Sequence, residues 1–526
     1  MKKTFLSLVA LCLCAALLAP GAGASPLKPR ILFVPHDDRP VSFKQTAETL
    51  RKLPVELLTP PPALLGSRTR PGDPEGLWRW LQESAPKVDA AVLSSDALLY
   101  GSLVASRKHA LPRETILARA ERFQKLSADF PRLDLYAFGS IMRTPRDGNA
   151  SSEEPDYYAA YGAQIFRLTA LEDKAETEGL SRQETRELEK LRAAIPAEAL
   201  ADWLARREKN FAANARLVEL AENGVFRYLA LGRDDNAPHS QTHKESRRLD
   251  AKAAGLDKSR FQTLAGIDEM ALLLLTRAAN RTGALDIPFV AVRYADGAGE
   301  KTVPTYSDEA IGTSIRAQLF AAGAIPVPTT KRADLVLLVN TNADGATFEA
   351  NAPVNDGAPR ENTASFAEAV ETYLAAGHPV GIADIAFANG ADNALLAALE
   401  ARGALPRLTA YAGWNTANNS SGFAIGQGIL ARHMNEADKN ELLAVRLLDD
   451  WAYQANLRQM LAARLVYPAL ALAASRQATE FAAQRLPQFG LHKVRLDFPW
   501  NRMFETDVTL LPKSKAENKI GGKEKP

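Results

Sequence analysis

The sequence predicts an α/β protein with two lobes, each built on a mostly parallel, doubly wound sheet, and with a helical C-terminal part. Short apolar runs rich in Val, Ile, Leu and Phe alternate with helical patterns along most of the chain, as in successive βαβ units. Most of these runs are continuous rather than alternating, which is typical of parallel strands covered by helices on both faces. Sheets of this kind are Rossmann-like. A distorted β/α barrel is the alternative arrangement.

The expected strands and helices follow one another at short spacings. Strands are predicted at 31–34, 55–58, 90–94, 134–139, 226–231, 262–266, 288–293, 334–340, 379–383 and 408–412. Helices are predicted at 44–52, 75–83, 112–128, 268–280, 307–322, 364–376, 391–402 and 421–433. This alternation is the reason for expecting the strands to run parallel.

The first 24 residues have the pattern of a secretory signal peptide. Lys2 and Lys3 precede the apolar run 5–18, which is short for a membrane span, and the small residues 22–24 form a cleavage site. We therefore expect an exported protein, periplasmic or extracellular after cleavage. Both cysteines, Cys12 and Cys14, lie in this segment, so the mature chain has no disulfide, thiol nucleophile or thiolate ligand.

The mature chain divides into three regions and a tail. We expect an N-terminal α/β domain over 25–286, a second α/β domain over 287–432, a helical region over 433–512 and a disordered, Lys-rich tail over 513–526. Residues 155–222 interrupt the first domain with charges spaced as on solvated helices, and Pro196 separates two arms. An exposed helical hairpin and a lid over a cleft are the two interpretations.

Charge argues against polyanionic partners. The 526 residues include 64 Lys and Arg and 62 Asp and Glu, and removing Lys2 and Lys3 with the signal peptide makes the two numbers equal. A neutral chain is not typical of proteins whose main partner is nucleic acid or an anionic membrane. We expect a small-molecule or carbohydrate substrate, and no stable membrane insertion.

Polar clusters follow directly after most predicted strands. Examples are His36 to Arg39, Ser94 to Asp96, Arg233 to Asn236 and Asp268-Glu269. In parallel sheets the carboxyl ends of all strands share one edge, and ligands bind in the crevice there. These side chains are therefore expected to meet in one pocket, although they are spread over about 380 residues of sequence.

Helix capping is the other interpretation of polar residues after strands. It suffices for Asp96, Asp384 and Asp392, because one side-chain oxygen can satisfy the free N–H groups at a helix start. It does not explain doubled acids such as Asp37-Asp38, nor Arg39 and Arg143 beside them. For the doublets we favour a role that faces a ligand.

Paired carboxylates are suited to general acid and base catalysis, and glycoside hydrolysis requires little more than two of them. The leading hypothesis is therefore a hydrolase, and specifically a glycosidase acting on a carbohydrate or cell-wall sugar. The candidate catalytic residues are Asp234, Asp235, Asp268 and Glu269. The candidate substrate-binding residues are Asp37, Asp38, Arg39, Asp96, Tyr100, Arg107, Arg143, Asn236, His239, Trp414 and Asn415, with the two aromatic rings placed to stack on sugars.

Two other functions are consistent with the same residues. A periplasmic protein that binds a polar, sugar-like molecule between two α/β lobes would need the same cleft without the chemistry. A metal-dependent hydrolase could use Asp37, Asp38, Asp96, Asp235 and His239 as ligands, although the chain has no HExxH motif. No cofactor is expected, with a divalent metal as the alternative, and no P-loop or G-x-S-x-G motif occurs.

Several segments resemble those of a known family. They are "PHDDRPVS", "SSDALLYGSLVASR", "IMRTP", "GRDDNAPHS", "AGIDE", "AYAGWNTANNSSG" and "FPWNRMFE", and they occur in this order between about residue 30 and residue 507. They resemble the hallmark segments of bacterial domain-of-unknown-function family 4127. The resemblance covers nearly the whole mature chain and supports the position of the site, while it implies no particular activity.

Overall fold

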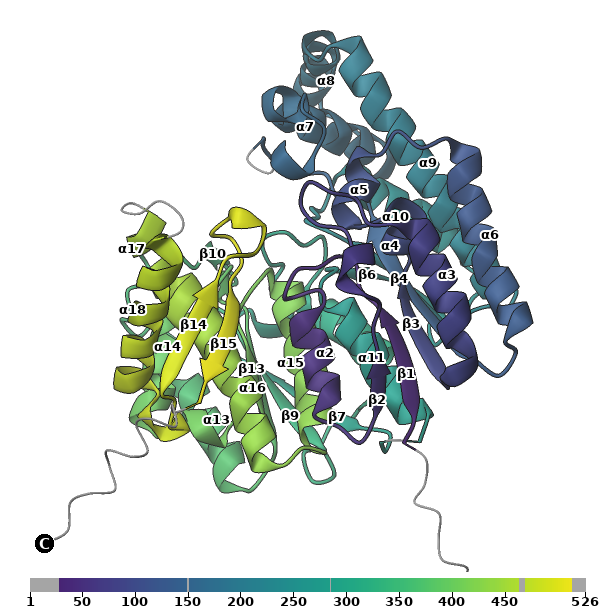
Figure 1. Ribbon diagram of the computed structural model, residues 1–526. Coiled ribbons are helices and arrows are strands. Elements are labelled where there is room, and N and C mark those ends of the chain that lie inside the picture. The colour runs from purple at the N-terminus through teal and green to yellow at the C-terminus, as the bar shows by residue number, and fades with distance from the viewer. Residues whose placement is uncertain (1–27, 149–150, 284, 463–468, 513–526) are drawn as a thin grey trace, which may run out of the picture.

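Six parallel strands form the first of two large sheets in the computed structural model, which describes residues 28–148, 151–283, 285–462 and 469–512 (Figure 1). We call this sheet A. Across the sheet its strands are β2 (Glu56–Leu58), β1 (Arg30–Val34), β3 (Ala90–Ser94), β4 (Asp134–Ile141), β5 (Tyr228–Arg233) and β6 (Phe261–Ala265). The register places Ile31 between Leu57 and Ala90.

Five further parallel strands form the second sheet, sheet B. In spatial order they are β8 (Ile325–Pro326), β7 (Phe289–Tyr294), β9 (Leu335–Asn340), β11 (Val380–Asp384) and β13 (Ala410–Ala412). Counted from its first strand in the chain, sheet B has the order 2-1-3-4-5, which is also the order of the first five strands of sheet A. The predicted α/β class with doubly wound parallel sheets is confirmed. The barrel alternative is wrong, because both sheets are open in the described part of the chain.

Four helices form the layer between the sheets: α2 (Lys44–Arg51), α11 (Met270–Arg281), α12 (Ile311–Ala321) and α15 (Ala417–Ala431). Figure 1 shows α11 and α15 in the centre, where they pack against each other. Every residue of α15 is buried. Gly426 permits the close approach of the two helices, because a Cβ there would lie 2.6 Å from Cγ of Leu272. A single hydrophobic core therefore runs from sheet A to sheet B.

The outer faces of the sheets are covered separately. Around sheet A lie α3 (Pro74–Ser84), α4 (Ser95–Tyr100), α5 (Leu103–Lys108), α6 (Arg113–Asp129) and α10 (Gln241–Lys252), and around sheet B lie α13 (Thr363–Ala375) and α14 (Asn393–Ala401). With apolar side chains packed on both faces, the central strands are buried along their whole length, which explains their continuous apolar sequences.

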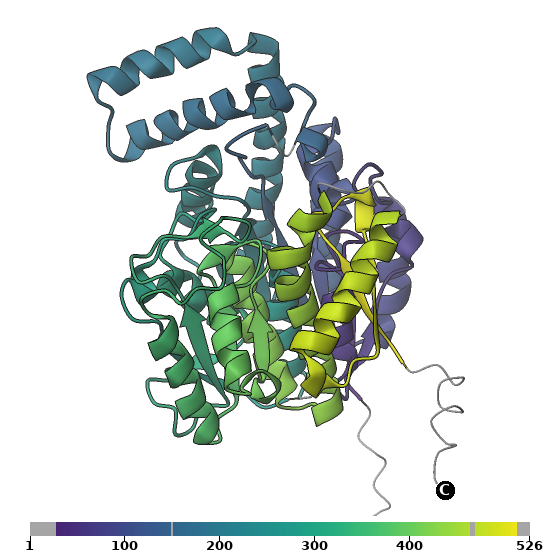
Figure 2. The ribbon, with the colours of Figure 1, turned by 90° about the vertical axis from the view of Figure 1, so that its left-hand side faces the viewer.

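The charged segment 155–222 forms three helices, of which the first two project from sheet A (Figure 2) and the third packs its C-terminal half against that sheet's core. They are α7 (Tyr158–Thr177), α8 (Arg182–Ala194) and α9 (Ala197–Glu222). Pro196 precedes α9, at the expected break between two arms, and Ser181 and Glu184 form a capping box at the start of α8. Asp173 ties α7 to α10 by accepting hydrogen bonds from His243 and Arg247.

The C-terminal region is helical, but it also contains strands that the sequence did not indicate. It comprises α16 (Glu436–Arg446), the π-helix η6 (Leu447–Leu457), α17 (Arg458–Ala462) and α18 (Ala469–Arg485), followed by the antiparallel pair β14 (Lys493–Asp497) and β15 (Asp507–Leu511). A second short pair, β10 (Phe348–Glu349) and β12 (Phe387–Ala388), lies in sheet B's lobe. The sequence did not indicate β14 because its apolar and polar residues alternate over only five positions, close to Pro499, and so short a pattern is a weak strand signal.

Two predictions fall on segments outside the described residues. They are the signal peptide at 1–24, with both cysteines, and the disordered tail at 513–526. Within the described ranges, no helix has the length and apolar character needed to cross a membrane.

Because one core spans both sheets, truncating a leucine inside it should lower the free energy of unfolding far more than truncating an exposed leucine. Leu273 on α11 is fully buried between the sheets, whereas Leu472 on α18 is 77% exposed. Leu273→Ala should lower the free energy of unfolding by about 2–5 kcal/mol, because it leaves a cavity in the core. The matched change Leu472→Ala should stay within about 0.5 kcal/mol. Urea unfolding followed by circular dichroism measures both, and equal midpoints would contradict a core that spans the two sheets.

Candidate functional site

A cavity of about 580 Å³ lies where the carboxyl ends of the two sheets face each other. Loops after β4 and β5 of sheet A contribute Arg143, Pro145, Arg146, Asp147, Ser152, Glu153 and Asp235. Loops of sheet B's lobe contribute Thr305, Tyr306, Asn389, Asn415 and Thr416, and the C-terminal region contributes Arg458, Arg502 and Phe504. The cavity thus joins segments that are more than 350 residues apart in sequence, as its lining from residue 143 to 504 makes plain.

Arg143 organises one wall of this cavity. Its guanidinium donates to Asp235 Oδ2 at 2.9 Å, to Glu153 Oε2 at 3.2 Å and to Glu154 Oε1 at 2.7 Å. Glu153 also accepts from Arg107 at 2.8 Å and from Arg502. Two carboxylates that line the cavity, those of Asp235 and Glu153, are therefore held against the same guanidinium.

These two carboxylates have opposite pKa shifts. Burial and the neighbouring charge of Asp234 raise the pKa of Asp235 to about 6, although Arg143 opposes the change. Burial alone would also raise the pKa of Glu153, but the charges of Arg143, Arg107 and Arg502 outweigh it and hold that pKa well below its usual range. Near neutral pH the cavity wall therefore carries one carboxyl close to its titration point and one fixed carboxylate.

Backbone strain is concentrated at the same place. Among the described residues, five that are not glycine have a positive φ, and three of them line the cavity: Asp235 at 40°, Tyr306 at 68° and Asn389 at 63°. The other two, Trp500 and Asn501, belong to the C-terminal loop whose Trp500 ring lies against Arg39 and Arg502. Such conformations cost about 1–3 kcal/mol each and tend to occur at functional sites.

Further polar groups stand behind the wall in a connected network. Arg39 donates to Asp37 at 2.9 Å and to Asp268 at 2.9 Å, and Asp268 in turn accepts from Asn415 at 3.3 Å. Asp234 accepts from Arg107, the partner of Glu153. Burial raises the pKa of Asp268. The structure therefore brings Asp37, Arg39, Arg107, Asp234 and Asp268 together beside the cavity, where Arg107 contacts the lining residue Glu153 and Asp268 contacts the lining residue Asn415.

At the topological switch point between β1 and β3, His36 is buried beside Asp96. Its Nδ1 lies 3.2 Å from Asp96 Oδ2 and 3.0 Å from Ser94 Oγ. Asp96 accepts two hydrogen bonds from Ser140, from its amide and its hydroxyl, both at 2.8 Å. Asp96 is therefore not a helix cap. Ser94 caps α4 instead, whereas Asp392 does cap α14.

The remaining candidate residues do not line the cavity. Glu269 is fully buried between α11 and α15, where burial raises its pKa well above the usual range. His239 contacts Glu178 at the end of α7, and Asn236 is buried, with its backbone N–H donating to the carbonyl of Tyr306. Asp38 accepts from Trp500 Nε1 at 2.7 Å on an exposed surface.

The two aromatic rings expected to stack on sugars do not line this cavity. Trp414 is 1% exposed, with its ring 5.7 Å from that of Phe504. Tyr100 stacks on His109 at 4.9 Å and lines a neighbouring cavity of about 520 Å³, which shares Ser152 with the first. The rings that do line the main cavity are those of Tyr306 and Phe504.

Several lining residues were missed from the sequence. Glu153 belongs to a doubled acid, Glu153-Glu154, but the doublet begins twelve residues beyond the end of its strand, so no strand end drew attention to it. Arg502 and Phe504 lie in "FPWNRMFE", a segment noted for its resemblance only. Asn389 lies in the polar stretch after a predicted strand, whereas Tyr306 and Arg458 carried no signal that separates them from ordinary loop and helix residues.

A metal centre has no ready set of ligands here. Within the described ranges, no group of three or more His, Cys, Asp or Glu side chains is arranged to hold an ion. The carboxylates around the cavity contact arginines instead.

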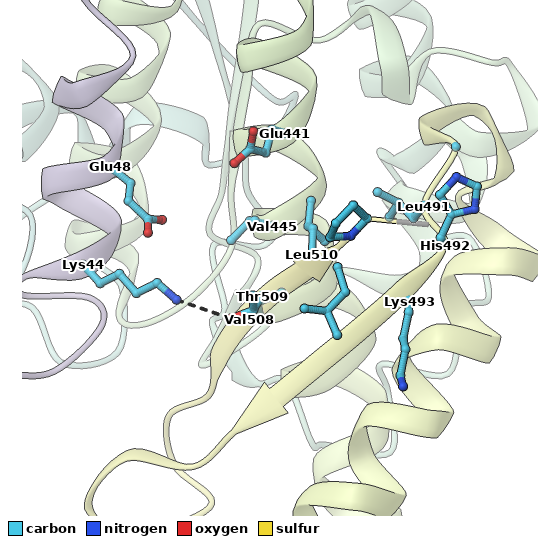
Figure 3. Close-up of a pocket in the computed structure, with 13 residues that line it drawn as sticks. Lys44, Glu48, Glu441, Val445, Leu491, His492, Lys493, Val508, Thr509 and Leu510 are labelled. Carbon is cyan, nitrogen blue, oxygen red and sulfur yellow. Dashed lines mark hydrogen bonds between the residues drawn. The ribbon is translucent and has the colours of Figure 1, made fainter. Parts of the chain in front are cut away.

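Another cavity, of about 380 Å³, lies between α2, α16 and the β14–β15 pair (Figure 3). Figure 3 shows Lys44, Glu48 and Glu441 on one side and the hairpin on the other, with Lys44 donating to Thr509 Oγ1 at 3.5 Å. Its lining combines Lys44 and Lys493 with Val508 and Leu510, and no two carboxylates there share an arginine.

The amino-acid sequence matches a family model over most of its length. The family is described as "Protein of unknown function (DUF4127)", and its model covers residues 31–509. The chain belongs to DUF4127. The predicted resemblance is thus confirmed over both lobes and the C-terminal region, so all the segments around the cavity belong to the DUF4127 part of the chain. No curated protein matches the chain.

The raised pKa of Asp235 predicts a pH-dependent effect on stability. The unfolded carboxyl ionises near 3.8 and the folded one only near 6, so the folded protein loses stability relative to the unfolded chain as pH rises between these values. Asp235→Asn removes this loss and tolerates positive φ. At pH 7.5 the variant should be more stable than the wild type by about 1–3 kcal/mol. At pH 4.5 the difference should be much smaller.

Thermal unfolding at both pH values tests this expectation. Asp257→Asn, in an exposed loop before β6, is the matched control and should show no pH-dependent difference. An Asp235→Asn effect that is the same at the two pH values would show that the carboxyl does not titrate there.

Proposed function

We propose that the protein is an exported hydrolase that cleaves glycosidic bonds in the cavity between its two lobes. The observation that carries the proposal is the pair of lining carboxylates, Asp235 and Glu153, whose pKa values are displaced in opposite directions around one guanidinium. Such divergence is the property that assigns acid and base roles to carboxyl groups.

In this proposal Asp235 is the general acid. With a pKa of about 6 it is protonated in part of the molecules near neutral pH, and its side chain is 27% exposed to the cavity. It donates its proton to the glycosidic oxygen as the bond to the anomeric carbon breaks, and the water that then adds to this carbon returns a proton to Asp235. Arg143 keeps the carboxyl oriented, since the two are joined at 2.9 Å.

Glu153 is the second carboxylate, which stays ionised and stabilises the positive charge that develops at the anomeric carbon. Its charge is balanced by Arg107, Arg143 and Arg502, which fix its position. Asn389, Asn415 and Thr416 offer amide and hydroxyl groups to sugar hydroxyls, and Tyr306 and Phe504 offer ring faces. Asp268 and Asp234 act as positioning groups behind the wall, through Asn415 and Arg107.

A protein that only binds a sugar-like molecule is the second candidate. It is favoured by the position of the cavity between two lobes with the same strand order, where ligands of α/β proteins bind. In that case the ion pairs would serve to hold the cavity open without chemistry.

Turnover of a panel of chromogenic glycosides, with both anomers of each sugar, separates the two candidates. Asp235→Asn should lower kcat by about 10²–10⁴-fold, because the proton donor is lost, and Glu153→Gln should also lower it. In the wild type, activity should fall as pH rises through about 6, since the acid must be protonated. Asp257→Asn serves again as the control with unchanged activity. Sugar-dependent thermal stabilisation without any turnover would favour the binding protein.

Export is part of the proposal and rests on the N-terminal sequence. If residues 1–24 are a signal peptide, the protein recovered from the periplasm or medium should begin at Ser25. Mass spectrometry of the intact protein from each cell fraction measures this. A protein found only in the cytoplasm with Met1 or Lys2 at its N-terminus would contradict export and leave the cavity chemistry to be judged separately.

A further inference from the structure

The cavity walls carry more positive than negative charge. Four arginines line it, Arg143, Arg146, Arg458 and Arg502, against the three acidic residues Asp147, Glu153 and Asp235. Arg143 and Arg502 are engaged by carboxylates, the first by Glu153, Glu154 and Asp235 and the second by Glu153 and Glu505. Arg146 and Arg458 have no carboxylate within 4.0 Å in the part of the chain that the structure describes.

The unpaired guanidiniums are held by uncharged groups. Arg458 lies over the ring of Phe504, 5.0 Å from its centroid, and donates to the side-chain oxygen of Gln454 at 3.1 Å. Arg146 lies 5.9 Å from the ring of Phe166. Ring faces attract cations but do not neutralise them, so both side chains keep a full positive charge toward the cavity.

The pKa shifts separate Arg458 from Arg143 and Arg502 in the same way. Carboxylates raise the pKa of Arg143 and Arg502 despite the burial of both groups. Burial lowers the pKa of Arg458, and Tyr453, Glu349 and Glu505 only partly offset it. A guanidinium partly removed from water without a counter-ion is less stable than a paired one, and an anionic ligand would restore the pairing.

We propose that the cavity takes a sugar bearing an anionic group, a carboxylate or a phosphate, and that Arg146 and Arg458 receive this group. The inference rests on the proposed function for the sugar, but not on its hydrolysis. Guanidiniums bind the oxygens of both anions through paired N–H groups. The ring of Phe504, which contacts both Arg458 and Arg502, and that of Tyr306 would lie along the sugar.

Isothermal titration calorimetry with D-glucose, D-glucuronate and D-glucose 6-phosphate tests the inference on the purified protein. At least one of the two anions should bind on the order of tenfold more tightly than glucose, a difference that one charge-assisted contact can supply. Preference for glucuronate would identify the anion as a carboxylate, and preference for the phosphate ester would identify it as a phosphate. Either preference should weaken as salt is raised.

Variants assign the effect to the two arginines. Arg458→Gln and Arg146→Gln should each reduce the ratio of anion affinity to glucose affinity, whereas Arg458→Lys should retain part of that ratio. Arg402→Gln, on an exposed helix end, is the matched control and should behave as wild type. Absence of any preference for an anion, including no binding of any of the three sugars, would overturn the inference, as would wild-type preference in both Gln variants.

The two proposals fail separately. Anion-selective binding without cleavage of any glycoside would support the anionic subsite and reject the hydrolase. Cleavage of glycosides with the same efficiency for neutral and anionic sugars would support the hydrolase and reject the subsite.

Discussion

Buried contacts between guanidiniums and carboxylates hold together the loops on which the cavity depends. Glu153 accepts from Arg107, Arg143 and Arg502, and the last contact joins segments 349 residues apart. Arg39 likewise joins Asp37 to Asp268 across 229 residues. Removing one member of such a group leaves the others as uncompensated buried charges. The ion pairs therefore stabilise one another and hold the loops of the cavity wall together, which keeps Asp235 and Glu153 in fixed positions.

The position of the cavity follows from how two similar sheets are joined. Both have the order 2-1-3-4-5 in their first five strands, and the layer of α2, α11, α12 and α15 packs them into one core. The switch point of sheet A lies between β1 and β3, but the C-terminal loop covers the residues there, since Trp500 contacts Asp38 and Arg39. The open space lies instead beyond β4 and β5, where Arg143 and Asp235 reach it.

The sequence was sufficient to predict elements whose signal is local. Continuous apolar runs indicated each of the longer strands, because burial on both faces dictates their composition. Strand-end clusters indicated Arg143, Asp235 and Asn415. The β14–β15 pair, Arg458 and Arg502 could not be predicted, because only the packing of the C-terminal region against both lobes gives them their positions. Nor could the sequence show that Glu269, the second acid of a doublet after a strand, is buried in the interior of the molecule.

Displaced pKa values alone would not select the site. Burial raises the pKa of Asp384 and Asp449 to about 6 and that of Asp450 to about 7, values close to that of Asp235. However, these three side chains are at most 1% exposed and accept hydrogen bonds from Tyr411, Gln454 and Arg446 respectively. A proton held there has no path to a ligand. Asp235 differs because its carboxyl opens into a cavity beside a fixed carboxylate and a strained backbone. It is this combination of titration, access and geometry, and not any one of them, that marks a site for chemistry.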